Sequence, residues 1–413
     1  MSERQTMPTA RKTTHETTTT GAGSSTPAAE TTLPAGWRMV RFGEMAMNIS
    51  DRVDNPSEAG VKYYVGLEHL DPESLRISRW GVPTDVEATK LRFRSGDIIF
   101  GRRRAYQRKL AVADFEGICS AHAMVLRAKP EVVLPEFLPF LMQSDMFFDR
   151  AMAISVGSLS PTINWKTLDV QQFPLPPLDE QRRIAELIWA ADETLELYQR
   201  VVSTQKALKQ SLLKQFFENP SLTKFTSLGS VGNWLSGGTP SRSNNSYWNG
   251  DIPWASPKDM KVDSLGSTEE KITVEGSRKG TRLVPAETIF IVVRGMILAH
   301  TFPISITSRE MAFNQDIKAL ICNSMFNSKY ILYWFQYKSS DILGITSNSS
   351  HGTKRIPTDS LFSMKVPIIN IDNQHNIVNI LSKIDRSIEQ SIIHCAITKK
   401  LKQRLLKNSF LIN

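Results

Sequence analysis

The chain has 413 residues, of which 41% are hydrophobic, and a formal charge of +9, so it can bury two or three domain cores. No apolar run reaches the roughly 20 residues that span a bilayer, and no basic-then-apolar leader is present, so we expect a cytoplasmic protein with no membrane partner. Its three cysteines are far apart and form no CxxC pair, which argues against a disulfide framework or a zinc site.

Residues 1–33 are rich in Thr, Ser, Ala and Gly and predict a disordered tail. Residues 34–176 then alternate short β-prone runs with Gly, Pro and Asp turns. A helix is expected near their end, in "PEFLPFLMQSDMFFDRAMAI", where bulky apolar residues recur at intervals of three and four. This segment is predicted to be an α+β domain.

Residues 177–220 predict one long helix, because no Gly or Pro occurs between Asp179 and Phe217 and "ENP" follows. Asp179 is the expected N-cap. A helix of this length would be ~58 Å long, more than one small domain can enclose. Its apolar positions follow a coiled-coil seam that drifts later to Val201, Leu208 and Leu212. The seam residues are Ile184, Ile188, Ala191, Leu195, Tyr198 and Val202.

The architecture then repeats at a constant separation of 193 residues. The strap "FPLPPLDEQ" is matched by "VPIINIDNQ", so that Pro367 corresponds to Pro174 and Gln374 to Gln181. Residues 221–366 are thus a second α+β domain, and residues 367–413 a second long helix. The second seam consists of Ile377, Leu381, Ile384, Ile388 and Ile392.

Each helix alone would expose an apolar stripe to water, and pairing the helices buries both stripes. The predicted fold class is therefore α+β, with two pseudo-repeated globular domains separated by two long antiparallel helices that form a coiled coil.

Positive charge is concentrated between Lys90 and Lys109, where eight Lys or Arg residues face the single acid Asp97. Guanidinium groups that leave a strand can bind phosphates or read guanine edges, so we predict DNA contacts here. The alternative is a solvated basic loop. The candidates are Arg102, Arg103, Arg104, Tyr106, Gln107, Arg108 and Lys109.

The second domain offers weaker candidates in "SGGTPSRSNNSYWNGDIPWASPKDM", which could equally be a Gly-rich surface loop. They are Arg242, Asn244, Asn245 and Lys258. The loops before the two straps carry equivalent polar residues, for which we predict contacts with the DNA backbone. These are Ser158, Asn164, Lys166, His351, Lys354 and Arg355.

Catalytic signatures are missing from the sequence, which has no GxxxxGK[ST], GxSxG, HExxH or Asn-Pro-Pro-Tyr-like motif. Asp263, Glu269 and Lys271 loosely resemble a metal-dependent nuclease triplet, and a charged surface loop is the alternative interpretation. His122 lies among apolar residues and is expected to be a hydrogen-bonded core or edge histidine.

The paired straps and helices, the "SGDIIFGRRRAYQRKLAV" block and the "GSLSPTINWKTL" lead-in together resemble the specificity subunit of type I restriction-modification enzymes. The resemblance covers residues 34–413. The second strap departs from the pattern, because it has lost two prolines.

The resemblance implies that two target recognition domains each bind one half of a bipartite, asymmetric site in double-stranded DNA. The helices would set the spacer and dock two modification (methyltransferase) subunits, and restriction (translocase/nuclease) subunits would join them. It implies no catalytic residue, metal or cofactor in this chain; S-adenosylmethionine, ATP and magnesium would belong to the partner subunits. Methyltransferase-only and fused-nuclease systems are related alternatives.

Overall fold

The structure is a computed structural model that describes residues 33–348 and 353–410. The chain forms two compact units: unit 1 comprises Met1–Ile188 with Gln403–Asn413, and unit 2 comprises Trp189–Lys402. The tail predicted for residues 1–33 lies outside the described residues except for Leu33. Within the described ranges, no helix is long and apolar enough to cross a membrane.

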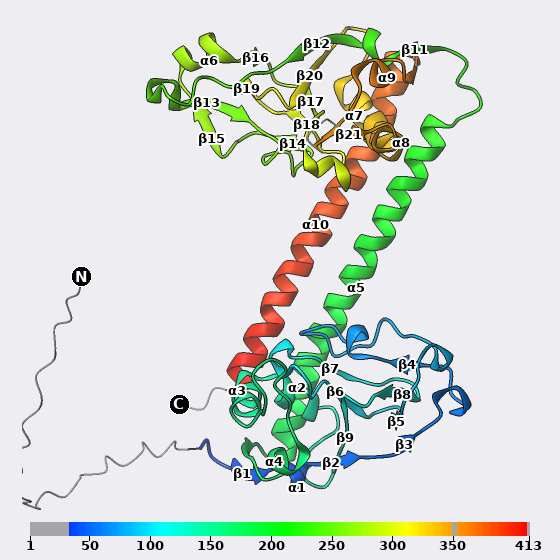
Figure 1. The fold of residues 1–413 in the computed structure, drawn as a ribbon, viewed down its shortest axis with the longest axis vertical. Helices are drawn as coiled ribbons and strands as arrows, with labels where there is room; N and C mark the ends of the chain where they lie inside the picture. The colour runs from blue at the N-terminus through cyan, green and yellow to red at the C-terminus, as the bar shows by residue number, and fades with distance from the viewer. Residues whose placement is uncertain (1–32, 349–352, 411–413) are drawn as a thin grey trace, which may run out of the picture. The chain divides into compact units, whose positions relative to one another are not determined.

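Unit 1 contains two four-stranded sheets (Figure 1). The antiparallel sheet β2-β9-β6-β7 consists of β2 (Ala46–Ile49), β9 (Met124–Ala128), β6 (Ile98–Phe100) and β7 (Leu110–Val112). The sheet β3-β5-β8-β4 consists of β3 (Arg52–Val53), β5 (Lys90–Phe93), β8 (Gly117–Ser120) and β4 (Tyr64–Val65), and its β4 runs parallel to β8. All three residues of β6 are buried, as expected for a strand covered on both faces.

The helix predicted before the first strap is in fact two helices, α2 (Leu138–Gln143) and α3 (Asp145–Ala153). Ser144 separates them because its backbone is extended and its hydroxyl accepts a hydrogen bond from the Phe147 amide as the N-cap of α3. Both helices bury apolar side chains.

Unit 2 has a larger version of the same arrangement. The sheet β12-β20-β17-β18-β14 consists of β12 (Gly232–Ser236), β20 (Ile317–Cys322), β17 (Ile289–Val292), β18 (Ile304–Thr307) and β14 (Ser264–Leu265). The sheet β15-β13-β19-β16 consists of β15 (Glu270–Ile272), β13 (Trp248–Ala255), β19 (Met311–Phe313) and β16 (Leu283–Val284). As in unit 1, the second sheet contains one parallel pair, here β13 with β19.

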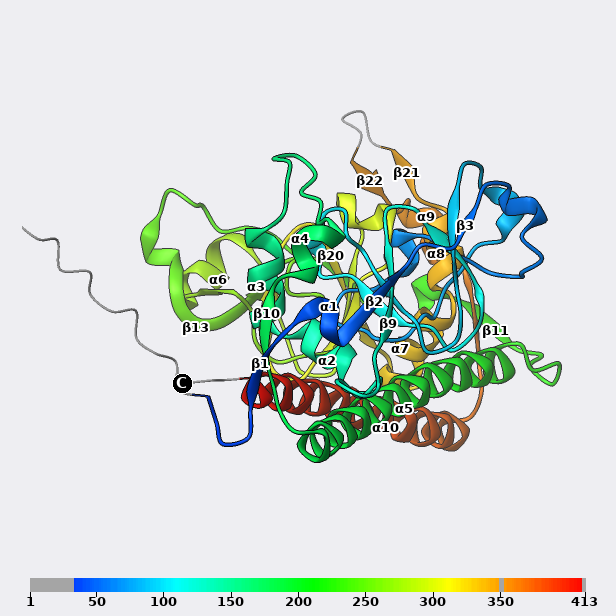
Figure 2. The same cartoon turned by 90° about the horizontal axis from the view of Figure 1, so that it is seen from below.

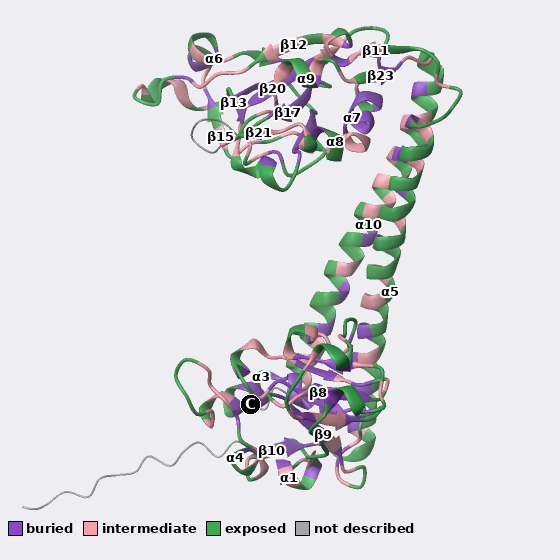
Figure 3. Cartoon of the chain, turned by 45° about the vertical axis from the view of Figure 1, so that its right-hand side comes forward, coloured by how far each residue is buried: buried purple, intermediate pink, exposed green. Residues whose placement is uncertain are grey.

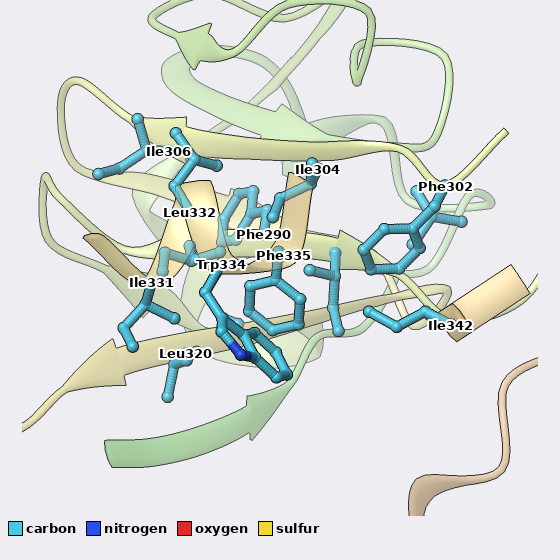
Figure 4. Close-up of a cluster of buried hydrophobic side chains, with 14 of the residues drawn as sticks. Phe290, Phe302, Ile304, Ile306, Leu320, Ile331, Leu332, Trp334, Phe335 and Ile342 are labelled. Atoms are coloured by element: carbon cyan, nitrogen blue, oxygen red, sulfur yellow. The ribbon is translucent and has the colours of Figure 1, made fainter. Parts of the chain in front are cut away.

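The core of unit 2 lies between its first sheet and α7 (Ser328–Tyr337), as Figure 4 shows. Trp334 and Phe335 of α7 belong to one buried cluster with Phe290 of β17 and Leu320 of β20. α7 ends before Lys338, and a second short helix, α8 (Ser339–Gly344), follows it. The remaining short helices of this unit are α6 (Val274–Gly280) and α9 (Thr358–Phe362).

Each predicted strap forms one strand of a two-stranded antiparallel ribbon. In unit 1, β10 (Gln172–Leu175) pairs with β1 (Arg38–Arg41), and in unit 2, β23 (Lys365–Pro367) pairs with β11 (Phe225–Ser227). Such a ribbon has open outer edges, where proline costs no ladder hydrogen bond. Two short helices, α1 (Phe42–Met45) and α4 (Trp165–Asp169), adjoin the ribbon of unit 1.

The two long helices are α5 (Leu178–Phe217) and α10 (Ile371–Ser409), which run side by side in both Figures 1 and 2. Within unit 2 they are antiparallel: the ring of Tyr198 stacks on His394 at 5.0 Å, and Gln205 Nε2 donates to Ser387 Oγ at 2.7 Å. The predicted α+β fold with two paired long helices is confirmed.

The seam between the long helices is more polar than predicted. Ile392, expected in the seam, is exposed, as are Val201 and Leu208. A straight helix has 3.6 residues per turn, so residues spaced at 3.5 gradually move around its surface. Over several turns these apolar positions turn outward and polar residues turn inward. The buried polar residues of the helices in unit 2 are Asp192, Lys209, Gln374, Ser391, Thr398 and Lys402. Exposed residues alternate with buried and half-buried ones along both helices (Figure 3).

The predicted N-cap at Asp179 is wrong, because α5 already begins at Leu178. Asp179 is the second helical residue, where its charge still favours the helix N-terminus. The residue that secures this junction is Gln181, whose side chain is buried. Its Oε1 accepts from the Leu134 amide at 2.8 Å, and its Nε2 donates to the Pro176 carbonyl at 2.9 Å.

Gln374 secures the start of α10 in the same way. Its Oε1 accepts from the Asn327 amide at 2.8 Å, and its Nε2 donates to the carbonyls of Met325 and Ile369 at 2.8 and 3.0 Å. These partners lie at the repeat separation of 193 residues from those of Gln181. The glutamine in each strap therefore ties a long helix to the domain that precedes it.

Candidate nucleic-acid interface

The basic segment of unit 1 forms the tip of the β6–β7 hairpin and contains a one-turn helix at Ala105–Gln107. Arg104 and Arg108, which flank this turn, have φ values of 56° and 53°. Non-glycine residues with positive φ are uncommon and cluster at functional sites. The tip is therefore a constrained loop rather than a freely variable one.

Four of the five cations at this tip make side-chain contacts with other parts of unit 1, and those of Arg103 are with Ser160 and His122. Arg102 Nη2 donates to the Ala121 carbonyl at 3.2 Å, and Lys109 Nζ donates to the Leu67 carbonyl at 2.7 Å. Arg108 pairs with Asp145 at 2.7 Å and lies over the Phe148 ring. The exposed residues of the tip are Arg103, Arg104 and Tyr106, and Gln107 is half-buried.

The loop that precedes the first strap packs directly against this tip, which joins two segments that the sequence predicted separately. The Arg104 amide donates to the Pro161 carbonyl at 2.8 Å, and the Ile163 amide donates to the Arg102 carbonyl at 3.0 Å. Arg103 Nε donates to Ser160 Oγ at 3.0 Å. The predicted phosphate-binding residues of this loop, Ser158, Asn164 and Lys166, are all exposed.

His122 also belongs to this cluster. Arg103 Nη1 lies 3.1 Å from His122 Nε2, an arrangement in which the neutral ring accepts from the guanidinium. Burial lowers the pKa of His122, and the charges of Arg103 and Arg102 lower it further. The expected hydrogen-bonded histidine is thus an acceptor that orients Arg103.

Unit 2 repeats this junction around Arg294. The Gly295 amide donates to the Lys354 carbonyl at 3.0 Å, and the Ile356 amide donates to the Val293 carbonyl at 3.0 Å. Arg294 forms a β-bridge with Arg355, as Arg103 does with Thr162. Arg294 and Arg355 are exposed and Lys354 is half-buried. His351, predicted beside them, lies outside the described residues.

Arg294 was not predicted as a DNA-binding residue, because the separation between the two repeats changes inside the domains. Aligning "DIIFGRRRAY" with "TIFIVVRGMI" requires a separation of 191 rather than 193 residues, and one arginine stands where unit 1 has three. A search for the buried strand followed by arginine would have identified it.

The other candidates of unit 2 lie around its second sheet. Arg242 makes a bidentate pair with Glu270 and stacks over the Trp248 ring at 3.7 Å. These hydrogen bonds raise the pKa of Arg242 and lower that of Glu270. Asn244 Oδ1 accepts from the Ser246 amide, whereas Asn245 and Lys258 are exposed. Arg242 is therefore held by the protein, and the latter two side chains are open to solvent.

The described residues give no support for a metal centre. No group of three or more His, Cys, Asp or Glu side chains among them could hold a metal ion. Asp263, the first residue of the nuclease-like triplet, accepts a hydrogen bond from Gln336 Nε2 at 3.1 Å. The arrangement is suited to binding phosphates and base edges through cations and amides.

Comparison with known proteins identifies the family to which the chain belongs. The model of the type I restriction modification DNA specificity domain matches residues 35–203 and 220–402. The chain is 40% identical over 164 residues to the EcoR124I/EcoR124II specificity subunit of Escherichia coli, which covers 39% of this chain and 41% of that protein. It is 27% identical to the E. coli EcoDI specificity subunit over 46% of each chain. These alignments span less than half of either relative.

Longer but weaker similarity extends over most of the chain. The HindI specificity subunit of Haemophilus influenzae is 20% identical, with 86% of this chain and 95% of that protein covered. Among solved structures, the type I restriction-modification S subunit from M. genitalium has a TM-score of 0.60 at 16% identity, covering 91% of this chain and 96% of that chain. A chain from a structural study of type I R-M complex assembly has a TM-score of 0.56 at 22% identity, covering 92% and 98%. The likeness to these structures shows a shared fold.

Proposed function

Because the chain belongs to the family of type I restriction-modification DNA specificity subunits, we propose that each of its two units binds one half of a bipartite, asymmetric site in double-stranded DNA. One observation carries this proposal: each unit places an exposed arginine, Arg103 or Arg294, at a β-bridge between the exit of its central strand and the loop before its strap. A device present twice in one chain can contact two different half-sites, whereas a homodimer requires a palindrome.

In this proposal the candidate residues have three different roles: phosphate contacts, base contacts and contacts that shape the protein. The exposed cations anchor the duplex through phosphates, and Tyr106, Gln107 and the side chains of Asn245 and Lys258 are available to base edges. Arg102, Arg108 and Lys109 shape the tip through their protein contacts, and Arg242 does the same for the second sheet of unit 2. Ser158, Asn164, Lys166, Lys354 and Arg355 add backbone contacts.

The long helices, we propose, set the spacer between half-sites and dock two modification subunits. Support for docking comes from bulky apolar side chains that remain exposed at positions related by the repeat, Leu187 with Ile380 and Leu208 with Leu401. Exposed apolar patches mark protein interaction surfaces, and recurrence at the repeat separation distinguishes these four positions from scattered surface residues. Two equivalent surfaces on one chain would accept two copies of one partner.

Catalysis would then reside entirely in the partners. Modification subunits would carry S-adenosylmethionine, and restriction subunits would use ATP and magnesium. A methyltransferase-only or fused-nuclease system would use this chain in the same way. The alternative of a self-sufficient nuclease predicts that the purified chain with plasmid and Mg²⁺ cuts DNA, and that Glu269→Ala abolishes cutting; that result would contradict the proposal.

Mapping methylated adenines in cells that express the chain with its modification subunits tests the half-site assignment. We expect wild type to show two half-sites with a fixed spacer, and Arg103→Ala with Arg104→Ala to relax one half-site only. Lys206→Ala, which removes an exposed charge on α5, is the matched control and should change neither. Equal loss at both half-sites would mean that the arginines add only general charge.

A further inference from the structure

A leucine projects from the loop that packs against the basic tip of unit 1. Leu159 is 94% exposed, the highest value among the bulky apolar side chains of the described residues. A single exposed leucine on a protein surface requires no explanation by itself. The surroundings of Leu159 distinguish it from such a residue.

The loop that carries Leu159 is closed at its base. The Val156 amide donates to the Thr162 carbonyl at 3.0 Å, and the Thr162 amide donates back to the Val156 carbonyl at 2.9 Å. Gly157 enters the turn with φ of 104°, which other residues rarely adopt. The leucine is thus presented at the tip of a small hairpin.

One guanidinium and one backbone amide of the basic tip hold the base of this hairpin. The Arg103 side chain binds Ser160, next to the leucine, and the Arg104 amide binds the Pro161 carbonyl. Both arginines are exposed, as are Asn164 and Lys166 beyond the loop. An apolar tip with exposed arginines at its base is complementary to a duplex, in which phosphates surround stacked bases.

We propose that Leu159 is a wedge that inserts between neighbouring base pairs of the half-site bound by unit 1 and partly unstacks them. This inference rests on the proposed DNA binding by unit 1. Apolar side chains used in this way kink DNA and allow it to contact more of the protein. In this arrangement the closed hairpin presents the leucine to the duplex, and the arginines at its base would bind phosphates beside the opened step.

Unit 2 shows a related combination. Met296 and Ile297 follow Arg294 after Gly295, and both are exposed. They lie on the strand-exit side of the junction, whereas Leu159 lies on the strap side. The proposed wedge therefore acts only on the half-site bound by unit 1. The half-site bound by unit 2 serves as the internal control for unstacking by Leu159.

The test uses the full chain assembled with its modification subunits. The DNA is a set of duplexes that carry the recognition sequence identified by mapping methylated adenines. Adenines of each half-site are replaced one at a time by 2-aminopurine, whose fluorescence rises when it is unstacked. We expect wild type to raise the fluorescence at one step of the half-site that the double variant Arg103→Ala with Arg104→Ala relaxes. Leu159→Ala should abolish the rise and weaken binding by about tenfold, which corresponds to ~1.4 kcal/mol.

Two further variants separate the wedge from general effects. Leu159→Met should retain the fluorescence rise, and Val170→Ala, which shortens another exposed apolar side chain of unit 1 (54% exposed), should leave fluorescence and affinity unchanged. A mismatch placed at the opened step should restore the affinity of Leu159→Ala, because the unstacking is then already supplied.

Unchanged fluorescence and affinity in Leu159→Ala, with binding still weakened by Arg103→Ala, would overturn the wedge and leave the proposed function standing. If the wild-type complex binds no duplex that carries the site, both the wedge and the proposed DNA-binding function are wrong. Thermal unfolding of Leu159→Ala should match wild type, since the side chain is solvent-exposed.

Discussion

Lys402 donates a hydrogen bond to Asp192 across the two long helices, with 2.6 Å between Nζ and Oδ1. The two side chains are only 8% and 9% exposed. Lys209 and Asp385 form the equivalent pair at 2.5 Å, with exposures of 11% and 30%. Each residue lies 193 positions from its counterpart in the other pair, so the ion pairs obey the internal repeat.

Buried ion pairs often add little net stability, because desolvation offsets the attraction, but they discriminate between alternative registers. Sliding one helix by a turn would leave four charges in a partly apolar seam without their opposite partners. The pairs therefore favour one antiparallel register over others that the apolar residues alone would permit.

Removing one partner of the buried pair should destabilise the chain strongly. Asp192→Ala is expected to lower the free energy of unfolding by about 3–5 kcal/mol, the usual cost of leaving a buried charge uncompensated. The reversed pair, Asp192→Lys with Lys402→Asp, should recover part of this loss. Urea unfolding followed by helical circular dichroism measures both, with Lys206→Ala as the exposed control. A reversed pair as unstable as the sum of its single variants would contradict this explanation.

The strap glutamines should matter more than their polarity suggests. Gln374→Met keeps the side-chain volume but leaves the Asn327 amide and two carbonyls without this partner. We expect the free energy of unfolding to fall by about 2–3 kcal/mol, since each buried unsatisfied group costs roughly 1–3 kcal/mol. Gln390→Met, exposed on the same helix, is the control and should shift the thermal midpoint little. Equal midpoints for the two variants would show that the hydrogen bonds at the junction are dispensable.

The sequence was sufficient to predict the tandem architecture, because the repeat, the straps and the uninterrupted helices are local patterns. The same separation of 193 residues relates Asp192 to Asp385 and Lys209 to Lys402, the four residues of the two ion pairs. Which side chains meet could not be predicted, since helix phase drifts over several turns and brings Lys402 inward while Ile392 turns out.

The candidate interface was less predictable for a different reason. Contacts such as Arg103 with Ser160 join segments far apart in the sequence, and charge alone does not separate arginines that shape the fold from those left exposed. Arg242 illustrates this limit. It was predicted as a DNA contact, and the structure shows that Glu270 and Trp248 also hold it, through contacts that no local pattern encodes.

The Arg242–Glu270 pair predicts a pH-dependent contribution to stability. Hydrogen bonds from Arg242 lower the folded-state pKa of Glu270 below its ordinary value of 4.5, so the pair stabilises above that value and the gain is lost as pH falls through the folded-state pKa. At pH 7 the free energy of unfolding of wild type should exceed that of Glu270→Gln. The difference should be no more than ~1 kcal/mol, because the pair is partly exposed to solvent. The difference should shrink on acidification below pH ~4.5. A constant difference from pH 7 to pH 3 would assign the effect to something other than this carboxylate.

Lengthening both helices together should change the proposed spacer without changing the half-sites. Seven residues inserted after Tyr198 and seven after Ser391 lie between the two ion pairs on each helix, so both pairs and the apolar phase are retained. The added length is ~10.5 Å, close to three base pairs of duplex.

Methylated-adenine mapping should then show the same half-sites with a spacer about three base pairs longer. An insertion after Tyr198 alone is the control: it leaves only one ion pair in register and should impair assembly rather than lengthen the spacer. An unchanged spacer in the double insertion would refute the role of the helices as a ruler, because the helix pair would be longer while the distance between the recognised sequences stayed the same.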